Sequence, residues 1–312
     1  MTIAPYLKEI GRGKQGARSL TRDQAADLFG RVLDGQASEL EVGAFCMAMR
    51  VKGETPQELA GFCDAAGARM ARAPATQRPV VVLPSYNGAR RLPVLTPLLA
   101  LLVAREGLPV LVHGHASEDT RVSTRAVLEH LSLTASPALG ALAEASVTYV
   151  DTQALLPGLA CLLDVRRAIG VRGSAHSVVK LLAPCAGPSL LVTSYTHPEF
   201  RDAMRETLCL TGARALLLRG TEGEPVADPR RAVAMTAVRD GQAADVQAAQ
   251  AGTVTSIPEL PACEAASTAQ WTARVLAGAE PVPAPIAAQL AQVLDLTAAA
   301  RANVPRHATF AA

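Results

Sequence analysis

Short apolar runs separated by longer mixed segments dominate residues 80–220. The runs are Val80–Leu83, Pro109–His113, Val147–Val150, Ser189–Thr193 and Ala213–Leu218. Each run has the length of a buried strand, and the segments between the runs are long enough to hold helices. Strands that alternate with helices usually pair in parallel, with crossover helices on the sheet faces. The pattern therefore predicts an α/β fold with a mostly parallel sheet flanked by helices.

The first 70 residues follow a helical period, and capping boxes mark where three helices begin. In each box a hydroxyl residue precedes an acid or amide residue by three positions: Thr21 with Gln24, Ser38 with Glu41, and Thr55 with Glu58. Pro56 stands at the first position of the third helix, and Gly35 and Gly53 fall where the first two helices should stop. A small N-terminal helical subdomain follows from these signals.

Two domains are therefore expected, a helical domain over residues 1–73 and an α/β domain over residues 80–312. A chain of 312 residues suits one large core and one small one. Within the second domain, Pro281–Ala302 has the pattern of a closing helix entered through a proline-rich turn.

Composition narrows the functional classes. Aromatic residues make up only 3% of the chain, so the core must consist mainly of Ala, Leu and Val. The six cysteines show no metal-ligand or paired spacing, which is typical of thiols in a reducing compartment. No apolar segment of signal-peptide or anchor type is visible near Met1, so we expect a cytoplasmic protein without a membrane partner. A net charge of +2 does not by itself indicate a nucleic-acid binder.

Residues Leu20–Met70, and above all Met49–Thr55 with the sequence MRVKGET, are very similar to the N-terminal helical segment of anthranilate phosphoribosyltransferases. The similarity continues through Glu106–Val110, Arg166–Arg172 and Ser194–Gly220. This resemblance implies the phosphoribosyltransferase fold over most of the chain. It also implies that the helical domain is a dimerisation domain, because the N-terminal helices are the usual dimer contact of that family.

The phosphate-binding loop of that family is altered in this chain. The family's Gly-Thr-Gly-Gly-Asp loop cradles the pyrophosphate of phosphoribosyl pyrophosphate with backbone amides. The degenerate loop here consists of Pro84, Ser85, Tyr86, Asn87 and Gly88. Pro84 has no amide hydrogen, and the side chains of Ser85 and Tyr86 would crowd a phosphate, so we expect no tight anion site.

Other family elements are changed as well. The Asn-Ile-Ser-Thr element corresponds to Val94–Pro97, in which Thr96 keeps a hydroxyl, and the Lys-His-Gly-Asn-Arg-Ser element to Val112–Ser117, without its lysine and arginine. Two carboxylates follow there, Glu118 and Asp119, and a carboxylate close to a pyrophosphate is unfavourable.

The family's magnesium-binding acidic pair has no adjacent counterpart in this chain. Glu222 and Glu224 are the nearest acids; they could coordinate a hard cation, but we expect exposed turn carboxylates. We therefore expect no catalytic residue, no metal site and no cofactor, with Mg only if the chain is an active transferase.

Arginines stand where the family's phosphate ligands are missing. Residues Leu83–Pro93 (LPSYNGARRLP) and Ser194–Glu199 resemble the YbiB branch of this superfamily, which implies a homodimer that binds DNA or RNA without sequence preference. Arginine offers a planar fork of donors that suits phosphate. The candidate nucleic-acid-binding residues are Arg90, Arg91, Arg121, Arg125, Arg166, Arg167, Arg172, Lys180, Arg230 and Arg231.

Several alternatives stay open at this point. Arg90 and Arg91 could simply form surface ion pairs, and Tyr86 could stack on a base. His113 and His115 could ligate a metal, although a buried histidine followed by a loop histidine is the better interpretation. Arg172 matches a family arginine that contacts the aromatic acid substrate. The chain could therefore be an active phosphoribosyltransferase with an unknown acceptor, or a regulator that binds a small anion or nucleotide.

Overall fold

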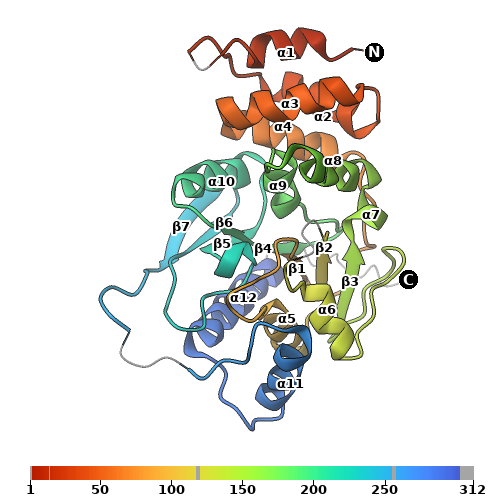
Figure 1. Ribbon diagram of the computed structural model, residues 1–312. Coiled ribbons are helices and arrows are strands. Elements are labelled where there is room, and N and C mark those ends of the chain that lie inside the picture. Colours follow the sequence, from red (N-terminus) through yellow and green to blue (C-terminus); the bar gives the residue numbers. More distant parts are fainter. Residues whose placement is uncertain (1, 14, 117–119, 255–257, 303–312) are drawn as a thin grey trace, which may run out of the picture.

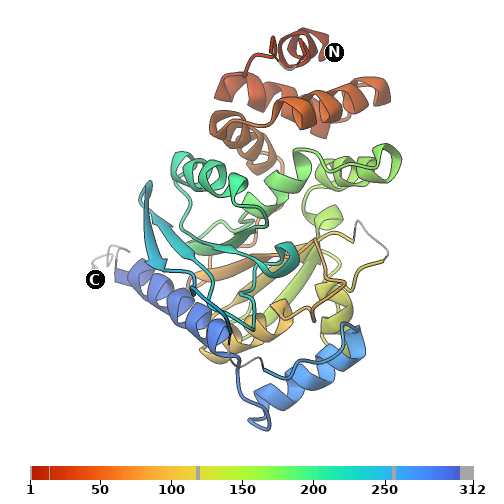
Figure 2. The same ribbon diagram turned by 60° about the vertical axis from the view of Figure 1, so that its left-hand side comes forward.

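The computed structural model describes residues 2–13, 15–116, 120–254 and 258–302. A layer of helices formed by the N-terminal part of the chain lies on top of an α/β unit (Figure 1). Turning the molecule shows the same two layers, with the C-terminal helices at the end of the α/β unit away from the N-terminal helices (Figure 2). Glu118 and Asp119 lie outside the described residues.

The N-terminal helices are α1 (Ala4–Ile10), α2 (Arg22–Leu33), α3 (Glu39–Lys52) and α4 (Pro56–Gly67). The last three begin where the sequence predicts. All three predicted capping boxes are present with both of their hydrogen bonds, and Pro56 opens α4. Gly53 ends α3 with a φ of 80°, a conformation that favours glycine. The short helix α1 was not predicted, because it has only seven residues and no side-chain N-cap.

The sheet has seven strands in the order β3-β2-β1-β4-β5-β6-β7. The strands that the sequence predicts are confirmed: β1 (Val80–Pro84), β2 (Val110–Gly114), β3 (Val147–Asp151), β4 (Ser189–Tyr195) and β5 (Ala215–Arg219). All pairs among these five strands are parallel. The residues of β1 alternate between two cores: Val81 and Leu83 contribute to one, and Val80 and Val82 to the other. Helices on both faces explain why the strands are apolar throughout.

A hairpin at one edge of the sheet was not predicted. It consists of β6 (Met235–Arg239) and β7 (Gln242–Gln247), and both of its pairings are antiparallel. Its turn residues Asp240 and Gly241 have φ values of 52° and 70°. Asp-Gly between two short runs is a strong hairpin signal. β7 is polar and mostly exposed, so it lacks the apolar pattern by which the other strands were recognised.

The helices after α4 cover the two faces of the sheet or join the helical layer. They are α5 (Thr96–Arg105), α6 (Thr124–His130), α7 (Thr152–Leu155), α8 (Pro157–Ile169), α9 (Ala175–Val178), α10 (Glu199–Leu210), α11 (Ala265–Leu276) and α12 (Ala284–Ala302). Two short 3₁₀ turns complete the elements, η1 (Val179–Leu181) and η2 (Thr221–Gly223). Helix α12 confirms the predicted closing helix, whereas α11 was not predicted. No helix among the described segments is both long and apolar enough to cross a membrane.

Helices α8 and α9 belong to the helical layer although they come late in the sequence. Leu159 and Leu163 of α8 share a buried core with Leu28 and Phe29 of α2. Figure 1 shows α8 and α9 directly beneath the N-terminal helices. This core ties the helical layer to the segment that precedes β4, so the edge of the layer comes close to the ends of the central strands.

The chain changes direction next to β1. From β1 it passes outward through β2 and β3, then returns to β4 on the other side of β1 and continues to β5. Ligands of open parallel sheets bind at such a switch point, outside the carboxyl ends of the two central strands. The loop Pro84–Gly88 leaves β1 there, and Thr196 and His197 follow β4 there. The candidate site is therefore built around these two loops.

Candidate functional site

The loop after β1 surrounds the carboxylate of Glu224. Oε1 of Glu224 accepts hydrogen bonds from the backbone amides of Asn87 at 3.0 Å and Gly88 at 2.8 Å. Its Oε2 accepts from the hydroxyls of Thr96 at 3.0 Å and Thr124 at 3.3 Å, and from the hydroxyl of Ser85. Glu224 is only 1% exposed. Five donors thus converge on one buried internal anion.

A second carboxylate organises the next part of the loop. Glu222 accepts hydrogen bonds from the backbone amides of Arg90 at 3.2 Å, Arg91 at 2.9 Å and Leu92 at 3.0 Å. Successive amides that converge on one anion form the same kind of concave site that binds phosphate elsewhere. Here the turn that carries Glu222 and Glu224 supplies both anions from within the chain.

Two expectations drawn from the sequence are wrong here. The loop does form a tight anion site, because Pro84 is the last residue of β1 and the donating amides belong to Asn87 and Gly88. Gly88 has a φ of 60°, and the Ser85 side chain turns inward as a donor instead of blocking the site. Glu224 is not an exposed turn residue, since it is buried by the loop that it holds.

Tyr86 points away from the Glu224 site and into the floor of a neighbouring cleft. It is 7% exposed, and its hydroxyl donates to the backbone oxygen of His176 at 2.9 Å. Burial raises the pKa of its phenol. A ring held in this way cannot stack on a base, so that alternative is wrong.

Lys180 lies against Tyr86 at the same floor. Its Nζ is 5.7 Å from the centroid of the Tyr86 ring and donates to the backbone oxygen of Ser194 at 2.8 Å. Burial lowers the pKa of the Lys180 ammonium to about 8, an effect that the nearby Glu224 carboxylate partly opposes and Arg172 reinforces.

The cleft above this floor has a volume of about 820 Å³ and lies between the helical layer and the ends of β1 and β4. Its walls come from α3, the segment around α8 and α9, and the start of α10. The basic residues that line it are Arg50, Lys52, Arg166, Arg172 and Lys180, and the acidic ones are Glu54 and Glu199. Lys52 also pairs with the buried Glu58 at 2.6 Å. The lining is therefore predominantly basic.

The structure separates the predicted arginines into groups. Arg166 and Arg172 line the cleft together with Lys180. Arg90 and Arg91 are exposed on the β1 loop, and Arg121 donates to the Gly88 oxygen at 3.2 Å beside the same loop. Arg167, on α8, donates to the Ala116 oxygen at 2.9 Å.

Three further candidates lie away from the cleft lining. Arg125 pairs with Glu129 and Asp151, each at 2.8 Å. Arg230 pairs with Asp228, also at 2.8 Å, and Arg231 donates to the backbone oxygen of Gln250.

Arg50 and Lys52 were missed as site residues. Both belong to the MRVKGET run, which carries the family resemblance but was given no role. Only the packing of α3 against the later helices brings these two side chains to the cleft. The basic residues of the MRVKGET run are a local signal for a site. The sequence does not show that this run meets the segment Arg166–Arg172, because the two lie more than a hundred positions apart.

The two histidines have the arrangement favoured from the sequence. His113 is 1% exposed on β2, and its Nε2 donates to the Leu182 oxygen at 3.1 Å. Burial lowers the pKa of His113 to about 4. His115 lies beyond the end of β2 and pairs with Asp164 at 2.9 Å. Within the described segments, no three His, Cys, Asp or Glu side chains gather as they would around a metal ion.

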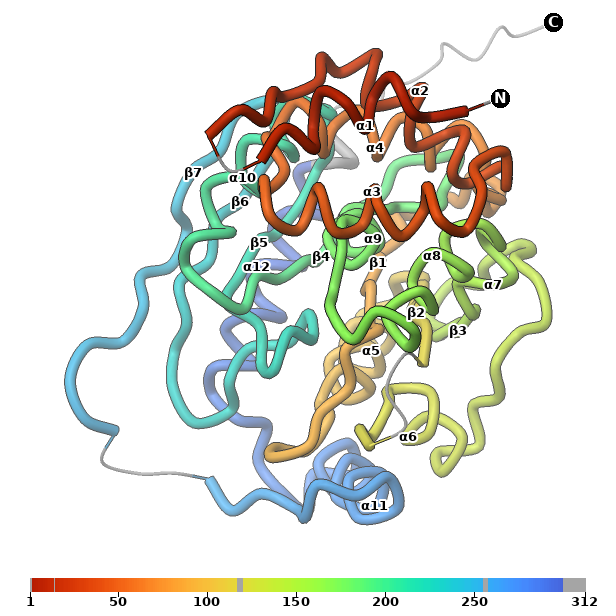
Figure 3. Tube along the Cα trace, turned by 45° about the horizontal axis from the view of Figure 1, so that its top comes forward, coloured from red at the N-terminus to blue at the C-terminus, as the bar shows by residue number. Residues whose placement is uncertain are grey.

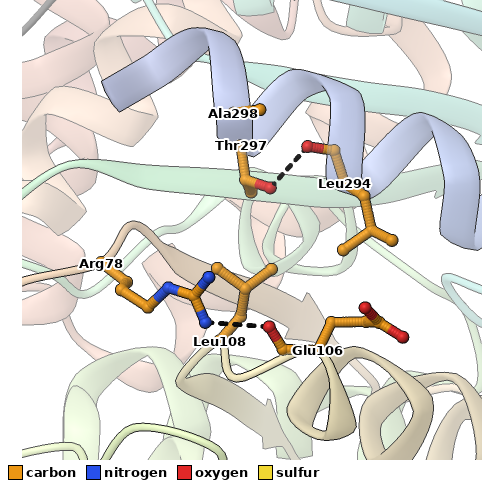
Figure 4. A pocket seen from close by; sticks show the side chains of 6 residues that line it. All are labelled: Arg78, Glu106, Leu108, Leu294, Thr297 and Ala298. Atoms are coloured by element: carbon orange, nitrogen blue, oxygen red, sulfur yellow. Dashed lines mark hydrogen bonds between the residues drawn. The ribbon is translucent and has the colours of Figure 1, made fainter. Parts of the chain in front are cut away.

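A second, smaller hollow of about 280 Å³ lies at the opposite end of the strands (Figure 4). Leu108, Leu294 and Ala298 provide much of its lining, and Arg78 at its rim donates to the Glu106 oxygen at 2.8 Å. It lies at the amino ends of β1 and β2, away from the switch point. We therefore assign the candidate site to the larger cleft.

Comparison with known sequences supports the same assignment of fold. Residues 4–70 match the helical bundle domain of the glycosyl transferase family. The Escherichia coli (strain K12) protein YbiB is 38% identical over 305 residues, covering 95% of this chain and 95% of YbiB. An anthranilate phosphoribosyltransferase from Idiomarina loihiensis is 30% identical over 212 residues, covering 65% of this chain and 62% of the relative.

Solved structures agree in fold at lower sequence identity. Anthranilate phosphoribosyltransferase from Thermus thermophilus superimposes with a TM-score of 0.71 at 20% identity, covering 96% of this chain and 90% of that enzyme. The Saccharomyces cerevisiae enzyme in complex with PRPP and Mg gives a TM-score of 0.66 at 13% identity, covering 95% and 88%. At these identities the likeness concerns the fold alone.

Proposed function

We propose that this chain, which belongs to the family of the E. coli protein YbiB and has an anthranilate phosphoribosyltransferase-like fold, is a homodimeric protein that binds nucleic acids. Binding occurs through contacts of basic side chains with phosphates and is independent of base sequence. The scaffold no longer transfers a phosphoribosyl group.

The observation that carries this proposal is the basic cleft at the switch point. Five Lys and Arg residues and two Glu residues line a space of about 820 Å³. Arg50 is exposed at its edge and offers its guanidinium to a phosphate. Phosphate contacts supply most of the affinity of sequence-independent binding, and they need no base-specific donors. With aromatic residues at 3% of the chain and Tyr86 buried, stacking makes little contribution.

The loop after β1 adds to this basic surface. Glu222 holds the backbone amides of Arg90 and Arg91, while both side chains remain exposed. A loop fixed by its backbone can present two guanidinium groups without a bound ligand. We expect it to extend the phosphate-binding surface beyond the cleft.

The same loop counts against phosphoribosyl transfer. Its amide and hydroxyl donors are already bound to Glu224, so a pyrophosphate would have to displace a buried carboxylate with five hydrogen bonds. We therefore expect the loop to contribute no binding of phosphoribosyl pyrophosphate and Mg²⁺, so any heat of titration should come from the basic cleft and disappear in Arg50→Gln with Arg166→Gln. A saturable heat that survives in this cleft variant would restore the transferase alternative.

An apolar stripe on α3 supports the proposed homodimer. Leu40 is 84% exposed, Met47 44% and Val51 62%, and these positions share one side of the helix. Figure 3 shows α3 along the outside of the helical layer. We propose that a second copy of the chain covers this stripe. Arg50 and Lys52 belong to the same helix and line the cleft, so pairing through α3 would also bring the two basic clefts of a dimer close together.

Gel shift with random-sequence DNA tests the function directly. About four phosphate contacts to a single strand predict that affinity falls roughly 50-fold between 50 and 200 mM salt. Oligonucleotides of unrelated sequence should bind with affinities within a few-fold of one another. Absence of binding at micromolar protein and 50 mM salt would refute the proposal.

A further inference from the structure

Lys180 is an unusual lysine because its side chain is buried without an opposite charge. It is 7% exposed, in the middle of η1, and its Nζ donates to one neutral acceptor, the Ser194 oxygen, at 2.8 Å. Among the described residues, no carboxylate lies within ion-pair distance of this Nζ. An ammonium has three donors, so this site satisfies the charged form poorly.

The groups around Lys180 explain the state of its amine. The ring of Tyr86, from the β1 loop, lies against the ammonium. The Tyr86 hydroxyl donates a hydrogen bond to the backbone oxygen of His176 in α9. Glu224 favours the charged form of Lys180 and Arg172 disfavours it, while burial is the largest effect and lowers the pKa from 10.5 to about 8. A substantial fraction of the amine is therefore neutral near physiological pH.

Lys180 is also reachable, because it forms part of the lining of the large cleft. Arg166 and Arg172 line the same cleft and provide partners for a phosphate group. A neutral amine at the floor of a basic cleft is the arrangement in which a lysine acts as a nucleophile toward carbonyl compounds.

We propose that Lys180 forms an imine with phosphate-bearing aldehydes that enter the cleft. The neutral amine attacks the carbonyl carbon and gives a carbinolamine, from which the former carbonyl oxygen leaves as water. The carbon–nitrogen double bond that results joins Lys180 to the former aldehyde carbon, with no oxidant or reductant required. The cleft cations hold the phosphate while this condensation takes place.

Nucleic acid supplies such an aldehyde at an abasic site. The ring-opened sugar left by loss of a base carries an aldehyde at C1′ between two phosphates, so it combines both features that the cleft accepts. An intact nucleotide offers no free carbonyl carbon of this kind. This part of the inference rests on the proposed nucleic-acid binding, whereas the reactivity of the amine does not.

Borohydride trapping tests the proposal with two probes. The first is pyridoxal 5′-phosphate, and the second is a single-stranded oligonucleotide with one abasic site; each is incubated with the wild-type protein and reduced, so that hydride adds to the imine carbon. Mass spectrometry then locates the adduct. The chain has four lysines, so Lys8, Lys14 and Lys52 serve as internal controls. We expect both adducts on Lys180 and at least about tenfold less on each other lysine.

The pH profile separates a perturbed amine from an ordinary one. With a pKa of about 8, the neutral fraction of Lys180 rises only about twofold between pH 8 and pH 10, so the trapping rate levels off. An amine with the ordinary pKa of 10.5 gains roughly 75-fold over the same range. A rate that keeps rising to pH 10 would overturn the assignment of a reactive amine.

Matched variants complete the test. Lys180→Arg keeps the positive charge and should abolish both adducts. Lys8→Arg, on α1 and outside the cleft lining, should leave both adducts unchanged. Loss of the wild-type adducts, or their location on another lysine, contradicts the proposal. If intact oligonucleotide binds but the abasic one gives no adduct, the abasic substrate is wrong. If pyridoxal 5′-phosphate reacts at Lys180 but no oligonucleotide binds, nucleic-acid binding fails and the reactive amine stands.

Discussion

At the scale of single residues, Glu224 decides what the phosphate loop can do. The sequence shows that the family's glycines are absent from the loop, and a change of function in the loop stays a prediction. The sequence could not show that the Glu224 carboxylate accepts hydrogen bonds from the loop after β1. Glu224 and this loop are separated by more than 130 positions and meet only through the pairing of β1, β4 and β5. A Thr-Glu-Gly-Glu turn looks like a solvated turn unless its partner is known.

Removing this carboxylate should open the anion site. In Glu224→Ala, the donors at Asn87, Gly88 and Thr96 lose their acceptor, and we expect a loss of about 3 kcal/mol in the free energy of unfolding. The melting temperature should fall by about 5 °C or more and recover with inorganic phosphate in a saturable manner.

The control for this rescue is Val226→Ala, which removes buried methyl groups near the same turn but leaves no donors unpaired. Phosphate stabilises proteins in general, and the rise in the melting temperature of Val226→Ala with phosphate measures this general effect. Equal responses of the two variants would show that Glu224 does not occupy an anion site.

The buried His113 makes stability depend on pH. Its pKa is lowered from 6.5 to about 4 in the folded protein, so below pH 6.5 the unfolded chain binds the proton more readily and stability falls toward pH 4. Relative to His113→Gln, wild type should lose about 3 kcal/mol of unfolding free energy between pH 7 and pH 4. Urea titrations of both proteins measure this difference. A constant difference across that range would mean that His113 is not buried in its neutral form.

At the scale of elements, the sequence predicts best what short-range chemistry determines. Capping boxes fixed the starts of α2, α3 and α4, and apolar runs identified the five parallel strands. The hairpin β6–β7 was missed because β7 is polar and mostly exposed and therefore has no apolar pattern, although β6 is buried. The participation of α8 and α9 in the helical layer was also missed, because it depends on contacts with α2 rather than on local pattern.

The exposed face of α3 predicts how two copies associate. Leu40→Glu combined with Met47→Glu places charges on the stripe without disturbing the buried face of α3, so the dimer should dissociate while the fold remains. Light scattering after size-exclusion chromatography measures the mass. Val246→Glu, at an exposed apolar position on β7, is the matched control and should stay dimeric. A wild-type monomer, or a dimer that survives both substitutions on α3, would contradict this interface.

At the scale of the whole molecule, the site exists only where the two layers meet. Lys180 and Tyr86 come from the α/β unit, and Arg50 comes from the helical layer. The sequence therefore predicted the fold. Of its candidate binding residues, Arg166, Arg172 and Lys180 line the cleft, and their role in binding stays a prediction. It could not predict that Arg230 and Arg231 lie outside the cleft lining, because their positions follow from the antiparallel edge of the sheet and from Asp228.

The most direct test of the account compares two pairs of arginines that carry the same charge. The affinity of a fluorescent random-sequence single strand is measured by anisotropy for wild type, for Arg50→Gln with Arg166→Gln, and for Arg230→Gln with Arg231→Gln. Both double variants lose two positive charges, but only the first pair lines the cleft. We expect the cleft variant to bind about tenfold or more weakly, and the other to remain within about twofold of wild type. Equal losses, or a larger loss for Arg230 and Arg231, would show that the cleft is not the binding site.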